Sequence, residues 1–275
     1  MPVLFLLLAV EAGFDVETFQ PAPGRGAFLA VESGRTEPGW EIGAGAGVER
    51  RPLVLESPAL AGSERLAVVK TRGTLDVHAA WADARWGASV ALPIALQDGS
   101  GADGTGISSA ATGDLRLEGR VRLLAGLAAG LALFVPTASA DFAGGRFAVE
   151  PRLFFERAWA RARLRGGANL SVRLAPERDF FDTRIGVAAL VAAGAAEWRV
   201  PWPGRLSRLR DRAGFLGELA GEWGGAGSPA PIEARAALRL WLASGWIVDA
   251  GGGGGFGHDP LVPSWRAFAL VRWEK

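Results

Sequence analysis

Residues 115–123 read Leu-Arg-Leu-Glu-Gly-Arg-Val-Arg-Leu, with a charged residue at every even position and an apolar residue or glycine at every odd one. A period of two is the repeat of a β-strand, whose successive side chains point to opposite faces of the sheet. The segment therefore predicts a strand with one apolar and one strongly charged face. Such a strand requires an apolar medium on one side and water on the other.

The same alternation recurs along the chain and predicts about twelve strands. Charged residues fall on the polar face of each segment and none falls on the apolar face, as expected where a charge against lipid costs about 2–4 kcal/mol. We expect an all-β fold, an antiparallel transmembrane up-and-down β-barrel. The expected strands cover residues 40–49, 75–81, 86–96, 114–123, 127–135, 147–156, 160–173, 182–191, 212–223, 232–242, 246–250 and 266–273.

The connections between these segments alternate in length. Outer-membrane barrels have short periplasmic turns and longer extracellular loops, and an even strand count places both barrel ends in the periplasm. The connection at 197–211 is long for a periplasmic turn, and Pro93 and Pro151 each require a bulge inside a strand. The tight gaps are 83–85, 124–126, 157–158 and 244–245, and the longer ones are 50–72, 98–111, 137–145, 175–181, 224–230 and 257–264.

Tryptophan is plentiful at 11 residues, whereas tyrosine is absent. Five tryptophans lie at the ends of expected strands, on the apolar face of the alternating pattern. Indole rings in such positions lie at the lipid–water boundary of a membrane barrel. In a soluble core they would more often fall in the middle of a strand. The expected members of this aromatic girdle are Trp40, Trp81, Trp86, Trp246 and Trp273.

The bulk composition narrows the function classes. The 275 residues carry a formal net charge of +1, which gives no basic surface for nucleic acid, and no cysteine, which excludes thiol chemistry. Residues 1–12 are interpreted as the remnant of an export signal or as a buried strand. We expect residues 13–38 to be a periplasmic N-terminal segment and residues 39–275 to be the barrel, located in the bacterial outer membrane.

The polar faces would line the lumen, and two interpretations stay open. The interior is either closed by paired charges or a narrow, weakly anion-selective pore, because rings of arginine attract anions whereas buried charges require partners. Arg161, Arg163 and Arg165 recur at a period of two and are expected to project inward together. The full expected lining is Arg116, Glu118, Arg120, Arg122, Glu150, Arg152, Arg161, Arg163, Arg165, Glu218, Glu222, Arg235 and Arg239.

Catalytic and metal-binding chemistry has weak support. His78, Ser89 and Asn169 share the expected inner face and match the residue types that an outer-membrane phospholipase uses, but no serine stands in a nucleophile motif. The loop at 98–104 lacks the closing glutamate of an EF-hand calcium site. We therefore expect no enzymatic activity, no cofactor and no metal.

Three short motifs resemble the N-terminal barrel of OmpA-family outer-membrane proteins. Residues 19–24 read Phe-Gln-Pro-Ala-Pro-Gly, 113–117 read Gly-Asp-Leu-Arg-Leu, and Val-Pro-Thr at 135–137 precedes Asp-Phe-Ala-Gly at 141–144. The resemblance implies an envelope barrel. Family members commonly carry a peptidoglycan-binding domain after the barrel, which this chain lacks, so no cell-wall anchoring role is expected.

The sequence thus predicts an outer-membrane barrel with a structural or narrow-pore role. Its expected partners are outer-membrane lipid, small solutes or ions, and the machinery that inserts barrels, with no nucleic acid among them. The alternative from another class is a soluble periplasmic β-barrel that binds a small ligand, since such barrels also alternate.

Overall fold

The computed structural model describes residues 19–56, 65–100, 106–139, 144–159, 161, 163–176, 178–180, 183–185, 188–201, 212–224, 231–256 and 263–275. These residues form β-strands joined by turns, together with the 3₁₀ turn η3 (Ala243–Gly245). The strands are β1 (Gly39–Glu56), β2 (Arg65–Ala82), β3 (Trp86–Ser100), β4 (Gly106–Thr112), β5 (Leu115–Leu124), β6 (Leu127–Val135), β7 (Ala148–Trp159), β8 (Leu164–Leu174), β9 (Arg178–Phe180), β10 (Thr183–Ile185), β11 (Ala188–Arg199), β12 (Ala213–Trp223), β13 (Ile232–Trp241), β14 (Trp246–Phe256) and β15 (Trp265–Glu274).

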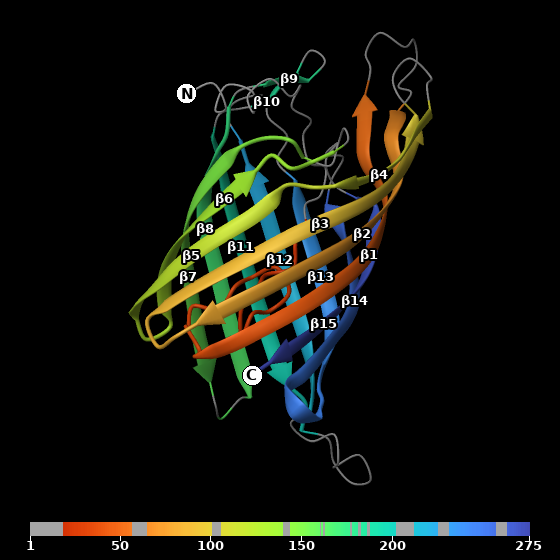
Figure 1. Ribbon diagram of the computed structural model, residues 1–275. Helices are drawn as coiled ribbons and strands as arrows, with labels where there is room; N and C mark the ends of the chain where they lie inside the picture. Colours follow the sequence, from red (N-terminus) through yellow and green to blue (C-terminus); the bar gives the residue numbers. More distant parts are fainter. Residues whose placement is uncertain are drawn as a thin grey trace.

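Twelve strands close into an antiparallel barrel (Figure 1). Each strand pairs with its neighbours in the order β1, β2, β3, β5, β6, β7, β8, β11, β12, β13, β14 and β15, and β15 pairs back with β1. Closure leaves no free sheet edge, so the backbone groups of every wall strand find partners within the wall. The predicted fold class is therefore confirmed.

The expected strands correspond one to one with the wall strands, but three details differ. The predicted loop at 98–111 contains β4, which pairs with β3 and continues the line of β5 after a break at Gly113 and Asp114. The predicted strand at 182–191 is β11 and covers Ala188–Arg199 instead. The small hairpin of β9 and β10 lies outside the wall and was not expected.

The two prolines lie where the ladder is interrupted. Pro93 pairs with Asp76 of β2, and its carbonyl accepts the Gly113 N–H at 2.8 Å where β4 and β5 break. Pro151 pairs with Leu131 of β6 and has no partner in the β7–β8 ladder. Both positions satisfy the rule that a strand proline requires a bulge or an unpaired side.

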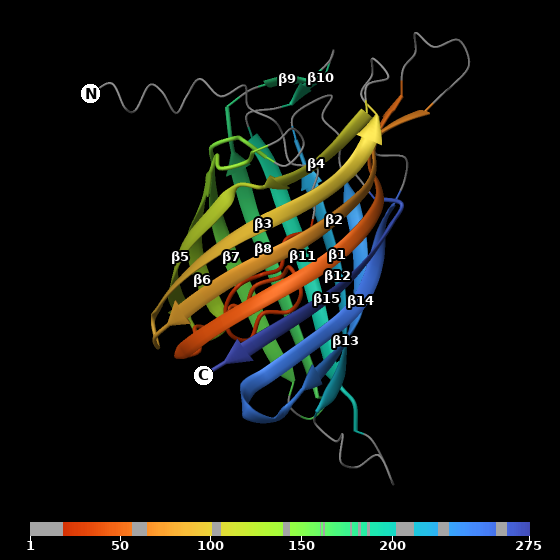
Figure 2. The same cartoon turned by 45° about the vertical axis from the view of Figure 1, so that its right-hand side comes forward.

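One end of the wall, called the short-turn end below, has mostly short connections, and the other end has the longer loops (Figure 2). The connection from β11 to β12, at 200–212, is the long exception at the short-turn end, and its residues 202–211 lie outside the described part of the chain. At the short-turn end, β1 begins beside the end of β15, and Trp40 and Lys275 exchange backbone hydrogen bonds of 2.9 Å. The β2–β3 turn is fixed by Asp83, which accepts the backbone N–H groups of Trp86 and Arg85 at 2.6 Å. These two bonds lower the pKa of the Asp83 carboxyl.

The two faces of the wall have opposite chemistry, and their orientation is the reverse of that in a soluble protein. The outer face exposes large apolar side chains, among them Leu131, Leu153 and Leu170, each 46–48% exposed. The inner face buries charged side chains, and Arg72, Arg239 and Arg272 are among the largest fully buried ones. Soluble proteins rarely expose a contiguous apolar surface of this kind, which is typical of a barrel wall that faces lipid.

Residues 19–38 lie inside the barrel and are referred to below as the lumen segment; in Figures 1 and 2 they form the red coil enclosed by the wall. Phe28, Val31 and Glu32 have no exposed surface. This position differs from the periplasmic one expected for residues 13–38. The lumen segment has no alternating pattern, so the sequence carried no indication of where it packs; residues 1–18 lie outside the described part of the chain.

Candidate functional site

The lumen segment is held mainly through its backbone by charged side chains of the wall. Glu218 of β12 accepts the N–H groups of Leu29, Ala30 and Val31 at 2.7, 3.0 and 3.0 Å. A carboxylate is a strong acceptor for several amide donors, and hydrogen bonds to a charged group are stronger than neutral ones. Glu218 therefore provides the hydrogen-bond acceptor for three backbone amide groups that would otherwise be buried without partners.

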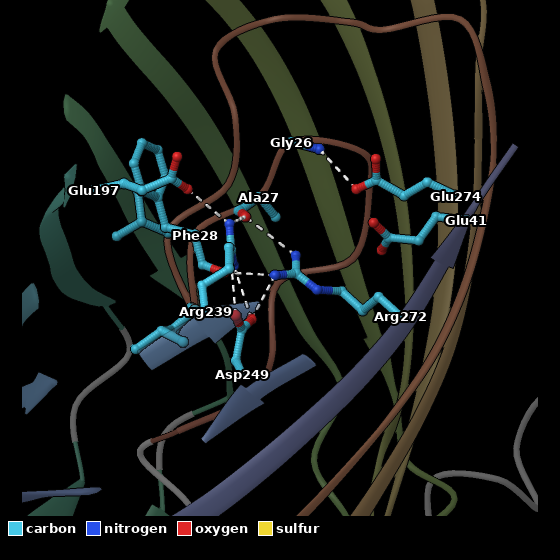
Figure 3. A network of polar contacts seen from close by, with 12 residues as sticks. Gly26, Ala27, Phe28, Glu41, Glu197, Arg239, Asp249, Arg272 and Glu274 are labelled. Atoms are coloured by element: carbon cyan, nitrogen blue, oxygen red, sulfur yellow. Dashed lines mark hydrogen bonds and ion pairs between the residues drawn. The ribbon is translucent and has the colours of Figure 1, made fainter. Parts of the chain in front are cut away.

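The carbonyl groups of the same segment are bound by arginines. Arg239 of β13 donates to the carbonyls of Ala27 at 2.9 Å and Phe28 at 2.5 Å, and Arg272 of β15 donates to the same two oxygens at 3.1 and 3.2 Å. Figure 3 shows both guanidinium groups converging on Asp249 of β14, with Arg239 also reaching Glu197. The wall thus supplies both the donors for the segment and the counter-charges for those donors.

Aromatic rings of the lumen segment fit into the wall. Phe28 lies under the guanidinium of Arg165, 4.2 Å from its ring centroid, in the geometry of a cation–π contact. The wall residue below it is Gly167, where a Cβ would come within 2.4 Å of the Phe28 ring. Phe19 packs against Phe268 of β15 with ring centroids 4.9 Å apart. Side-chain packing therefore adds to the hydrogen bonds that hold the lumen segment against the inner face of the wall.

At the short-turn end the lumen segment touches the wall backbone directly. A Cβ at Gly34 would lie 2.6 Å from the carbonyl oxygen of Gly126 and 2.7 Å from the amide nitrogen of Glu156, so only glycine fits there. The hydroxyl of Ser33 donates to the Glu156 carboxylate, which also pairs with Arg35 at 3.1 Å. This contact fixes the point at which the segment leaves the lumen toward β1.

A second charged group surrounds Glu32 of the lumen segment. Its carboxylate forms ion pairs with Arg116 of β5 and Arg152 of β7, and Arg120 lies 4.0 Å away. Glu118 of β5 pairs with the same two arginines, at 2.5 Å to Arg116 and 2.9 Å to Arg152. We call these five residues the Glu32 cluster.

Most of the predicted lining residues lie on the inner face. Arg152 and Arg165 are ion-paired and partly buried, and Glu222 pairs with Arg173 at 3.1 Å while its side chain stays 37% exposed. The remaining members are buried, namely Arg116, Glu118, Arg120, Glu150, Glu218, Arg235 and Arg239. The arginines have carboxylate partners, so the interior described here is charged and paired.

Three predicted lining residues do not lie in the lumen. Arg122 is exposed at the end of β5, where its backbone N–H donates a hydrogen bond to the carbonyl of Arg85 in the adjacent turn. Arg161 and Arg163 belong to the β7–β8 turn, because β7 runs on to Trp159 and β8 begins only at Leu164. Arg161, Arg163 and Arg165 keep a spacing of two residues, but the first two lie in a turn. Outside a strand, this spacing does not place side chains on one face of the wall.

The predicted tryptophans lie at the short-turn end of the wall. Four are exposed outward by 39–56%, and Trp273 is partly covered and donates its indole N–H to the Ser244 carbonyl at 3.1 Å. Trp159 and Trp198 add to the same end, with 42% and 44% exposure, and were not expected. Their contact with a lipid–water boundary stays a prediction. The four outward residues are Trp40, Trp81, Trp86 and Trp246.

The residues considered for catalysis have other contacts. His78 is buried against Glu41 at 3.1 Å. With its side-chain amide turned so that the oxygen faces the Glu32 N–H, Asn169 accepts that N–H at 2.9 Å and donates to the Glu32 carbonyl at 3.3 Å. Neither contact involves Ser89. Part of the calcium-like loop, residues 101–104, lies outside the described residues, and among those described no group of three or more acidic or histidine side chains is placed to hold a metal.

The sequence did not single out several residues that position the lumen segment. Glu32 and Phe28 belong to a segment without periodicity, so no pattern marked them, and Phe19 was noted only as part of the motif at 19–24. Asp249 and Arg272 lie on the polar, inward face of the alternating pattern in β14 and β15. The pattern alone could therefore have placed both among the predicted lumen-lining residues. Within the described chain, no helix has the length and apolar character needed to cross a membrane.

Comparison with solved structures places the fold among outer-membrane β-barrels. The chain is similar to the COG4313 outer membrane channel from Pseudomonas putida F1, with a TM-score of 0.65 and 14% identity over 87% of this chain and 96% of that one. It is also similar to the beta domain of the Bordetella autotransporter BrkA, with a TM-score of 0.53 and 13% identity over 86% and 100%. At these identities the likeness concerns the fold.

Sequence comparisons add no family. No family model matches the chain, and no curated protein matches it in sequence. The resemblance to OmpA-family barrels therefore stays a prediction that rests on three short motifs. What is established is a closed twelve-stranded barrel of the outer-membrane type with a peptide segment inside it.

Proposed function

We propose that the protein is an outer-membrane channel for small solutes, and that the lumen segment closes it in the state described here. One observation carries the proposal. The lumen is occupied by a separate stretch of chain, residues 19–38, and not only by side chains of the wall. Because this stretch is not a strand of the wall and is held inside it by hydrogen bonds, ion pairs and side-chain packing, it can leave without breaking the pairing of the wall strands.

The size of the barrel supports a channel over a purely structural role. Eight-stranded barrels have interiors just wide enough for their own side chains to fill, and the diameter grows with the number of strands. With twelve strands, this wall encloses a polypeptide segment in addition to its side chains. Removal of the segment would leave a polar passage lined by arginine and glutamate, which corresponds to the narrow pore expected from the sequence.

The outer surface supports an outer-membrane location and weighs against the soluble alternative. A soluble barrel that binds a ligand directs its apolar side chains inward and its charges outward. Here Leu131, Leu153 and Leu170 face outward while Arg239 and Asp249 are buried within. The resemblance to OmpA-family barrels agrees with an envelope location, and the channel role does not depend on it.

The proposal is tested by weakening the bonds that hold the lumen segment. Glu218→Gln removes the charge from the side chain whose Oε1 accepts all three backbone N–H groups, and hydrogen bonds to a neutral acceptor are weaker than those to a carboxylate. A loss of about 2 kcal/mol in docking free energy corresponds to a roughly thirty-fold higher open-to-closed ratio. We expect single-channel recordings in planar bilayers to show a rare conductance for the wild type and a frequent one for the variant.

Glu222→Gln is the matched control. It makes the same chemical change on the same strand, at a residue that pairs with Arg173 and is 37% exposed. This control should keep the wild-type conductance, and all three proteins should keep the gel shift on boiling that reports a folded barrel. If Glu218→Gln folds and remains as silent as the wild type, the lumen segment is not the gate and the channel proposal fails.

A further inference from the structure

Glu32 is bound in a way that differs from the rest of the lumen segment, because the wall contacts its side chain and not only its backbone. The carboxylate is fully buried, and one of its oxygens bridges the guanidinium groups of Arg116 and Arg152. Planar guanidinium groups are the side chains best suited to bind carboxylates. The two arginines come from β5 and β7, so a complete carboxylate receptor belongs to the wall itself.

This receptor offers more donors than Glu32 uses. The second carboxylate oxygen of Glu32 has no hydrogen-bond partner among the described residues, and the same holds for one terminal nitrogen of Arg120 and for Nε of Arg116. Arg120 is 4.0 Å from that oxygen, beyond hydrogen-bond distance. Buried donors without partners are costly. The site is therefore incompletely filled by a glutamate side chain.

The charge balance of the wall also depends on Glu32. Without it, Arg116, Arg120 and Arg152 would face Glu118 together with Glu150, which bonds Arg152 at 2.7 Å but is shared with Arg173 at 2.8 Å. The three guanidinium groups would then be balanced by the Glu118 carboxylate and by the Glu150 carboxylate, which also pairs with Arg173. A site of this composition attracts a small anion.

Asn169 of β8 presents Glu32 to the receptor. In the amide orientation that satisfies both groups, its side chain accepts the N–H of Glu32 at 2.9 Å and donates to the Glu32 carbonyl at 3.3 Å. These contacts leave the glutamate side chain to extend toward the arginines of β5 and β7. The segment therefore delivers one carboxylate to one place on the wall.

We propose that Arg116, Arg120 and Arg152 form a binding site for a small organic carboxylate on its way through the channel, and that Glu32 occupies this site as an internal substitute. The inference rests on the proposed channel function and names the class of its solute. A dicarboxylate would fill the site better than Glu32 does, because its oxygens can also reach the unused donors. Such a solute would compete with Glu32 and favour release of the lumen segment.

The direct test is binding of succinate to folded protein in detergent, measured by titration calorimetry. Glu32→Ala removes the competing carboxylate and leaves space, and we expect it to bind succinate at least tenfold more tightly than the wild type. Glu37→Ala is the matched control, since Glu37 lies in the same segment outside the cluster, and it should bind as weakly as the wild type. Succinamide, the neutral analogue, should bind to none of the three.

Two further arms test the site and the solute class. Adding Arg120→Gln to Glu32→Ala should remove most of the gain in succinate affinity. Inorganic phosphate, titrated in the same way, should bind more weakly than succinate; tighter binding of phosphate would overturn the carboxylate assignment. If Glu32→Ala fails to give the gel shift of a folded barrel, Glu32→Gln, which keeps the volume, is used with the same expected order of affinities.

A conductance measurement separates this inference from the channel proposal. In a tenfold gradient of potassium chloride, Glu32→Ala should show a reversal potential of anion-selective sign. If it conducts but prefers cations and binds no succinate, the carboxylate site is wrong while the channel stands. If it binds succinate and never conducts, the site stands as a binding site and the channel proposal fails.

Discussion

Two groups of arginines inside the barrel bind the lumen segment, and they do so differently. Around Asp249, the guanidinium of Arg239 uses all three of its nitrogens, with Asp249 at 2.7 and 2.8 Å, Glu197 at 2.9 Å and the carbonyls of Ala27 and Phe28. In the Glu32 cluster, nitrogens of Arg116 and Arg120 lack hydrogen-bond partners. Arg239 is saturated, although Nε of the neighbouring Arg272 has no partner; in the Glu32 cluster a terminal nitrogen of Arg120 and the Glu32 oxygen nearest to it both lack one.

The source of the counter-charge explains the difference. The acids that neutralise Arg239 belong to the wall, so this group stays balanced whether or not the lumen segment is present. One acid of the other group, Glu32, belongs to the segment and would leave with it. We conclude that the Asp249 group is a structural support of the wall, whereas the Glu32 cluster is built to exchange one anion for another.

Removing Arg239, whose three nitrogens all have partners, should have the largest effect. Arg239→Met leaves Asp249 and Glu197 buried with one partner fewer, and removing one member of a buried ion pair costs about 3–5 kcal/mol. We expect a lower urea midpoint for loss of the folded-barrel gel mobility. Arg122→Met, at an exposed arginine near the end of β5, should change the midpoint little; equal effects would contradict the assignment of Arg239 as a support.

Removing the ring of Phe28 should have an intermediate effect that is confined to the lumen segment. Phe28→Ala empties the space above Gly167 and loses the contact with Arg165, a loss of about 3 kcal/mol for a fully buried ring. The barrel should keep its gel shift on boiling, while channel openings become frequent. Loss of the folded barrel itself would mean that the segment is an integral part of the wall's stability.

The smallest effect is expected for Arg120 in the wild-type background. Arg120→Gln removes a buried charge whose contact with Glu32 is 4.0 Å long, so the lost attraction and the relieved desolvation nearly cancel, within about 1 kcal/mol. The urea midpoint should stay close to the wild-type value. A loss as large as that of Arg239→Met would show that Arg120 stabilises the barrel as strongly as Arg239 does.

The wall could be predicted from the sequence because the period-two pattern is a local property. Each residue from 115 to 121 reports its own face, and the burial of Arg116, Glu118 and Arg120 agrees with that pattern. The pattern misleads at the end of a strand, as at Arg122, and where the chain leaves the strand, as at Arg161 and Arg163. Strand ends depend on how far the neighbouring strands extend, and no local pattern records that.

The interior could not be predicted in the same way. The lumen segment is held through backbone groups, and every residue offers the same N–H and carbonyl, so its contacts with Glu218 and Arg239 leave no mark on its own sequence. Glu32 is a single acid without a repeat. Which charges of the wall would pair across the lumen was also hidden, because partners such as Glu197 and Arg239 come from strands that are not adjacent.

The most direct test of the central claim measures whether the lumen segment is buried when the channel is closed and exposed when it is open. The chain has no cysteine, so Val31→Cys gives a unique thiol at a position with no exposed surface. In reconstituted vesicles, a small water-soluble thiol reagent should label it slowly in the otherwise wild-type protein. With Glu218→Gln added, labelling should be at least tenfold faster, in step with the conductance. Fast labelling in both proteins, or conductance without faster labelling, would contradict the account.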